Sequence, residues 1–174
     1  MTKSVLMSAV VLTAAMFSAQ GQSPAAQTSA TVGGKQLTIN YNAPSVRGRQ
    51  IFGEGGIVSH DPTYPVWRAG ANSATAFHTD ADLDIKGLKV PAGDHTIFVQ
   101  VTPEPWELII NKQTKQWGLA YDKSQDLGRV KMNVTKPSTP IETMKITLSS
   151  AGAKTGKLQI EWDKYVASVP ITVK

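Results

Sequence analysis

Apolar residues in this chain alternate with polar ones at every second position, in short runs separated by glycine and proline turns. Strands are predicted at residues 37–41, 95–101, 106–111, 130–135, 144–149, 158–162 and 166–173. A period of two places one set of side chains on a core and the other on water, as in a half-buried strand. No stretch keeps a helical period for three turns without a proline or glycine. The pattern predicts an all-β antiparallel β-sandwich, jelly-roll-like, with about eight to ten strands.

Turn residues mark where the predicted strands are joined. Residues 151–156 hold two glycines between two long strands, so they are expected to close a hairpin. Pro170 has no backbone N–H and therefore predicts a sheet edge or a strand break within residues 166–173. An exposed edge at these residues could pair with a partner protein.

The first 21 residues have the features of a secretory signal peptide. Lys3 supplies a positive start, residues 5–17 form a mainly apolar run, and Ala19 and Gly21 are small residues suited to a cleavage site before Gln22. The apolar run is shorter than the roughly 20 residues that a membrane-spanning helix needs. We therefore expect export to the periplasm or the cell exterior, with a single domain over residues 22–174. An uncleaved N-terminal anchor is the alternative.

The composition excludes several kinds of site and partner. Cysteine is absent, which rules out disulfides, thiolate zinc sites, iron–sulfur clusters and a cysteine nucleophile. The formal net charge of +5 is modest and its basic residues alternate with acidic ones, which argues against nucleic acid as a partner. No second long apolar run follows the signal, so the mature protein is not expected to span a membrane.

Residues 43–71 interrupt the strand pattern with repeated prolines and glycines, which predicts one long loop. Long loops inside a compact domain are usually functional or disordered. This one also contains Ile51, Phe52, Val58 and Trp67, enough apolar surface to hold it against the sandwich. We therefore expect an ordered loop across one opening of the sandwich, which is a natural position for a binding site.

Several motifs occur in a fixed order along the chain, at residues 40–53 (N-Y-x-x-P-S-V-R-G-R-x-I-F-G), 66–75 (V-W-R-x-G-A-N-x-A-T), 90–93, 106–112, 116–118 and 121–122. Together they resemble the domain of unknown function 2911 family of exported bacterial proteins, over nearly the whole mature chain. The resemblance implies a secreted, mostly β protein whose activity is not established. It supplies no catalytic residues.

The densest set of candidate binding residues lies in and beside the long loop. An indole offers flat apolar surface, guanidinium groups bind carboxylates or phosphates through paired N–H groups, and an amide both donates and accepts. Such a set suits a sugar, a uronic acid or the terminus of an acidic peptide. The predicted ligand-binding residues are Arg47, Arg49, Trp67, Arg68, Asn72 and Trp117.

These residues also have a purely structural interpretation. Trp67 can be a core residue, Arg68 and Asn72 can bind backbone carbonyls of the loop, and Trp117 can cap an open end of the sandwich. The placement of Trp67 relative to Trp117 separates the two interpretations.

Patterns for catalysis or metal binding are weak. His60, His78 and His95 lie far apart in the sequence, without the short paired spacing of zinc ligands. Ser59, His60 and Asp61 are consecutive, whereas the members of a catalytic triad must converge in a hydrogen-bonded line. We therefore assign no catalytic residue, no metal and no cofactor from the sequence.

The combined observations predict a non-enzymatic ligand-binding module for a glycan or another small acidic ligand. One alternative is a hydrolase of envelope or plant polysaccharide, which requires a pocket that joins two carboxylates or a histidine and a carboxylate. The other is a structural or interaction protein of the cell envelope.

Overall fold

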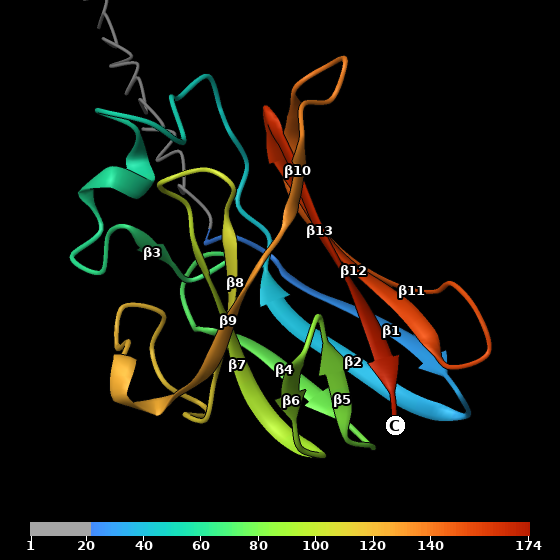
Figure 1. Cartoon of the computed structure of the whole chain (residues 1–174). Helices are drawn as coiled ribbons and strands as arrows, with labels where there is room; N and C mark the ends of the chain where they lie inside the picture. The colour runs from blue at the N-terminus through green and yellow to red at the C-terminus, as the bar shows by residue number, and fades with distance from the viewer. Residues whose placement is uncertain (1–21) are drawn as a thin grey trace, which may run out of the picture.

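The computed structural model describes residues 22–174, which form two antiparallel sheets packed face to face (Figure 1). The predicted signal at residues 1–21 lies outside the described residues. The seven-stranded sheet contains β1 (Ala25–Val32), β2 (Lys35–Asn42), β3 (Val66–Trp67), β4 (Thr75–Thr79), β7 (Gly93–Gln100), β8 (Glu107–Asn111) and β9 (Asp126–Lys131). The six-stranded sheet contains β5 (Leu83–Ile85), β6 (Leu88–Val90), β10 (Asn133–Thr135), β11 (Ile141–Ser150), β12 (Thr155–Asp163) and β13 (Tyr165–Val173). The predicted antiparallel β-sandwich is confirmed.

The strand number is higher than predicted, because four strands contain only two or three residues. A run of that length is too short to display a period of two. The only helical elements among residues 22–174 are two short 3-10 turns, η1 (Ile57–His60) and η2 (Lys123–Gln125). In this part of the chain no helix has the length and apolar character needed to cross a membrane.

Neighbouring strands mostly follow one another in the chain. The seven-stranded sheet has the order β1-β2-β4-β7-β8-β9, with β3 beside β7. The six-stranded sheet has the order β11-β12-β13-β5-β6, with β10 beside β13. The expected hairpin joins β11 to β12.

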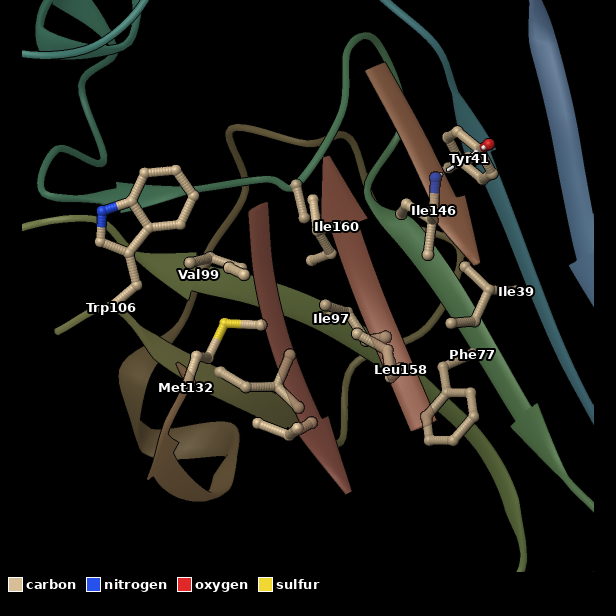
Figure 2. Close-up of a cluster of buried hydrophobic side chains, with 14 of the residues drawn as sticks. Ile39, Tyr41, Phe77, Ile97, Val99, Trp106, Met132, Ile146, Leu158 and Ile160 are labelled. Carbon is tan, nitrogen blue, oxygen red and sulfur yellow. Dashed lines mark hydrogen bonds between the residues drawn. The ribbon is translucent and has the colours of Figure 1, made fainter. Parts of the chain in front are cut away.

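Aliphatic side chains from the inner faces of both sheets fill the space between them (Figure 2). Ile39 and Ile97 of the first sheet are fully buried, as is Leu158 of the second. Tyr41 links the layers, because its hydroxyl oxygen accepts a hydrogen bond of 3.1 Å from the backbone N–H of Ile146 in β11. The inward residues of the predicted strands therefore form the core.

Strand β7 differs from the expectation that one of its faces meets water. Ile97 and Val99 face the core as predicted, but Thr96 and Phe98 on the opposite face are also no more than 1% exposed. The connection between β8 and β9 folds over this outer face, and its Tyr121 packs on Phe98 with ring centroids 4.9 Å apart. The outer face of β7 is therefore covered by a loop, which the alternation of side chains along the strand does not reveal.

The predicted strand at residues 130–135 is two strands in two different sheets. Val130 belongs to β9 and Val134 to β10, and the chain crosses between the sheets at Met132. Met132 is only 3% exposed, and its N–H donates to the carbonyl of Trp106 over 2.8 Å. The side-chain alternation continues through the crossing, so the pattern alone does not show the break.

Residues 166–173 do not form the free sheet edge that Pro170 was expected to mark. Strand β13 pairs with β12 along one side. On its other side residues 166–168 pair with β10 and residues 172–173 pair with β5. Pro170 lies in the gap between these two partners, where a missing N–H breaks no pairing on that side.

Candidate functional site

The long loop between β2 and β4 is anchored by apolar side chains buried in the sandwich. Ile51, Phe52 and Val58 are all less than 10% exposed. The Phe52 ring packs edge-on against Trp67 with centroids 5.4 Å apart, and it lies 4.9 Å from the ring of Trp106. The loop, coloured from cyan to green in Figure 1, therefore has a shape set by core packing.

Trp67 lies in this aromatic cluster and is 1% exposed. Its indole stacks on that of Trp162, with centroids 5.7 Å apart and planes inclined by 21°. A side chain this deeply buried cannot offer a face to a ligand. Trp67 is a core residue that contributes to the wall of a small cavity.

Arg68 links two segments of the loop through an ion pair. Its Nη2 donates to both carboxylate oxygens of Asp61, at 3.2 and 3.3 Å, and the two side chains are only 15% and 16% exposed. A Cβ on Gly118 would lie 2.3 Å from the Arg68 Cδ, so the chain after β8 packs directly against this side chain. The charge of Arg68 is therefore neutralised, and glycine is needed at position 118 because of the close approach.

Asn72 joins the long loop to the segment that carries Trp117. Its carbonyl accepts a 3.0 Å hydrogen bond from the Gly118 N–H, and Ser73 forms a β-bridge with Trp117. Trp67 and Trp117 therefore come from adjoining segments. Trp117 is 55% exposed, however, whereas Trp67 is buried, so the two indoles do not form one platform.

Arg47 and Arg49 extend from the exposed side of the loop. Arg49 Nε donates to the Val46 carbonyl at 3.0 Å, and Nη2 donates to the Ser45 carbonyl at 2.7 Å, which holds the guanidinium in place. The backbone N–H of Arg47 donates to Oε1 of Glu142 in β11. Within residues 22–174 the Arg47 guanidinium has no hydrogen bond or ion pair with another side chain.

Two small cavities share Arg49, and we call them together the arginine cleft. One has a volume of about 150 Å³ and is lined by Arg49, Asp61, Trp67 and Arg68, among others. The other, of about 210 Å³, is lined by Arg47, Arg49 and Asn72. The structure thus brings five of the six predicted site residues to the cleft, and Trp117 lies outside it.

Strained backbone is concentrated near the cleft. Among residues 22–174, six non-glycine residues have φ in the left-handed region, and two of these, Lys86 and Asp163, lie in hairpin turns. The other four have φ between 49° and 61°. Arg47, Ala69 and Asn72 lie at or directly beside the cleft, whereas Lys115 lies outside it. Such conformations cost about 1–3 kcal/mol each and cluster at functional sites. The three strained residues at the cleft therefore favour it as a site.

A polar network fixes the connection between β8 and β9, and the sequence analysis did not anticipate it. Arg129 donates to Asp126 Oδ2 at 3.0 Å and to the Tyr121 hydroxyl at 2.6 Å, and that hydroxyl donates to Asp126 at 2.7 Å. Asn111, fully buried, donates to Asp126 Oδ1 at 2.9 Å. Burial, together with the Asp126 carboxylate, raises the pKa of Tyr121. Asn111 and Tyr121 belong to the family motifs, the one sequence signal that could have pointed to them.

The three histidines do not converge. His60 is exposed in η1, while His95 is buried and its Nε2 contacts the Pro91 carbonyl oxygen at 2.8 Å. His78 lies on the outer face of β4. Within residues 22–174 no group of three or more histidine or acidic side chains is placed to hold a metal ion.

His78 has a carboxylate at each ring nitrogen. Nδ1 is 2.7 Å from Asp94 Oδ1, and Nε2 is 3.1 Å from Asp80 Oδ1. Both contacts are hydrogen bonds only when both nitrogens carry a proton, which favours the imidazolium. Because a carboxylate occupies each ring nitrogen, neither nitrogen of His78 is free to take a proton from a substrate.

The hydrogen bond to Asp94, followed by that to Asp80, raises the pKa of His78 above 6.5. A raised folded-state pKa stabilises the fold below the unfolded value, and this stabilisation is lost as pH rises through the folded value. We expect wild type to lose stability relative to His78→Gln as the pH rises above 6.5. In an NMR titration, Asp94→Asn should return the midpoint toward 6.5. A wild-type midpoint at or below 6.5 would contradict the ion pairs.

Comparison with known proteins gives one match. The family model described as "Protein of unknown function (DUF2911)" matches residues 23–171. A search of curated proteins and a search of solved structures each find nothing that matches this chain. The matched range includes every strand that the structure describes except the last two residues of β13, and all the residues of the arginine cleft except Gln22. The chain therefore belongs to the DUF2911 family, as its ordered motifs predicted.

Proposed function

We propose that this protein is an exported, non-enzymatic binding module whose arginine cleft takes a small acidic ligand, with a uronic-acid-containing glycan as the preferred class. Export is inferred from residues 1–21, where a positive start, a short apolar run and small residues precede Gln22. The ligand class is inferred from the charge of the cleft.

The observation that carries the proposal is the position of Arg49 between the two cavities. Its guanidinium uses two N–H groups to bind loop carbonyls, and the group has five in all, so paired donors remain for a carboxylate. Arg47 adds a second cation. The one carboxylate among the described lining residues, Asp61, is already bound to Arg68. The cleft therefore has an excess of positive charge.

The anchoring of the loop also supports a binding role. Its apolar residues are buried and Arg49 is held at both Val46 and Ser45, so little conformational freedom is left to lose when a ligand binds. The hydrolase alternative gains no support at the cleft, because Asp61 has no second carboxylate or histidine beside it among the described lining residues.

The test is a calorimetric titration with oligogalacturonate and with alginate oligomers. We expect Arg49→Ala or Arg47→Ala to weaken binding by about 10- to 100-fold, because a hydrogen bond to a charged group contributes about 1.5–3 kcal/mol. Lys157→Ala removes one exposed positive charge from β12 and serves as the matched control, with unchanged affinity expected.

Two outcomes would contradict the proposal. One is that neither acidic oligomer binds. The other is that all three variants weaken binding equally, which would indicate attraction to the net charge of the protein instead of a site. Arg49→Lys, which keeps the charge but loses the paired donors, should lie between Arg49→Ala and wild type.

A further inference from the structure

A second hollow lies on the outer face of the seven-stranded sheet, which we call the sheet groove. Its larger part has a volume of about 420 Å³ and its smaller part about 150 Å³. Asn40, Ala76 and Lys115 line both parts, so the two are continuous. The volume of the larger part alone falls within the range of small-ligand sites.

Small side chains and a fixed loop create this groove. Ala76 in β4 faces outward between the buried Thr75 and Phe77, and it leaves space where a larger residue would fill the hollow. Residues 114–116 of the connection between β8 and β9 form one wall. It is held by a hydrogen bond of 3.2 Å from the Ala74 N–H to the Gln116 carbonyl and by one of 2.6 Å from Thr96 Oγ1 to the Gln113 carbonyl.

The walls of the groove carry polar groups with free hydrogen-bonding capacity. Asn40 Oδ1 accepts from Gln27 Nε2 at 2.7 Å, which leaves the Asn40 amide N–H groups available. Asn42 donates to the Ser23 carbonyl, which leaves its own Oδ1 available. Within the described part of the chain, the Ser73 hydroxyl has no hydrogen-bond partner. In the larger part Lys115 is the one charged lining residue, so this part is polar with a single positive charge. In the smaller part Lys115 is joined by His78 and Asp94, which contact each other.

An exposed indole follows the wall of the groove in the chain, although Trp117 itself is not among the residues that line either part. Trp117 is 55% exposed, its chain neighbour Gln116 lines the groove, and its β-bridge partner Ser73 lines it as well. The neighbouring Lys115 has φ of 61°, a strained conformation that fixes the course of the chain at this wall. A flat apolar ring beside free amide and hydroxyl groups matches the two chemistries of a sugar ring, which has an apolar C–H face and polar hydroxyl edges.

We infer that the sheet groove is a binding site for a neutral saccharide unit, which stacks on Trp117 while its hydroxyls bond to Asn40, Asn42 and Ser73. The larger part of the groove has one cation, Lys115, whereas the arginine cleft has Arg47 and Arg49, so an anionic ligand is favoured at the cleft and not here. The unpaired polar groups disfavour a purely apolar ligand, since they would be left buried without partners. This inference does not rest on the proposed function of the cleft.

Fluorescence and calorimetry with the purified protein test the inference, with cellotetraose, xylotetraose, maltotetraose and chitotetraose as probes. Trp67, Trp106 and Trp162 are at most 4% exposed, so a change in accessible tryptophan emission reports on Trp117. We expect at least one probe to bind and shift this emission. Trp117→Ala should weaken its binding about tenfold or more, and Trp117→Phe should keep most of it.

Ala76→Leu gives an independent variant, because Ala76 is exposed and leucine there fills the groove without entering the core. It should abolish saccharide binding, whereas Arg47→Ala, in the cleft, should leave it unchanged. The inference is wrong if no neutral probe binds at about 10 mM, or if binding survives Ala76→Leu. If only acidic oligomers bind, and Arg47→Ala abolishes their binding, the inference about the sheet groove is wrong. The proposal for the arginine cleft is then still supported.

Discussion

Replacing Trp67 with alanine is expected to lower the free energy of unfolding by about 3–5 kcal/mol. The indole is 1% exposed and contacts the rings of Phe52, Trp106 and Trp162, so its removal leaves a cavity where the loop is anchored to both sheets. Urea denaturation followed by circular dichroism measures the loss.

Trp117→Ala is the matched control for this prediction, because it removes the same side chain from an exposed position. Its effect on stability should stay within about 0.5 kcal/mol, as for most surface substitutions. If the two variants lower the free energy of unfolding by similar amounts, the burial of Trp67 is not what anchors the loop.

The second large effect is expected from Asp126→Asn, at about 2–4 kcal/mol. The Asp126 carboxylate accepts hydrogen bonds from Arg129, Tyr121 and Asn111, and its side chain is only 10% exposed. The neutral amide leaves the charge of Arg129 without its partner in a mostly buried position. Denaturation measures the loss, and hydrogen exchange should show faster opening of residues 112–125.

Asp122→Asn provides the comparison in the same connection. Asp122 is exposed and caps η2 by accepting from the Ser124 N–H at 2.9 Å, and asparagine is nearly as good a cap. We expect little change in stability from this variant. Equal effects of the two substitutions, or unchanged exchange in Asp126→Asn, would mean that the network does not hold the loop.

The sandwich was predictable because its longest strands follow the period-two rule with few exceptions. In β12, for example, Leu158, Ile160 and Trp162 all face the core, as their spacing indicates. The buried outer face of β7 was not predictable, since Thr96 looks like a solvent-facing residue until its hydroxyl is seen to bond to the Gln113 carbonyl. The alternation of polar and apolar residues indicates which way each side chain points. It does not indicate which faces of the sheet a distant segment of the chain covers.

The candidate site was predictable as a region but not in its detail. The arginines of the cleft were found because glycine and proline mark residues 43–71 as a long loop. The role of Arg68 depends on its ion pair with Asp61 and on the close approach of Gly118. The contact with Gly118 joins segments that are far apart in the sequence. The sheet groove depends on residues from three neighbouring strands and on a loop, a combination that no sequence pattern shows.

The most direct measurement of the central claim is a ¹H–¹⁵N correlation spectrum of the protein titrated with oligogalacturonate. If the arginine cleft is the acidic-ligand site, chemical-shift changes should be concentrated at residues 45–49 and 70–72, with the Arg49 side-chain Nε–H among them. Changes scattered over the lysines of the surface, or no change at residues 45–49, would contradict it.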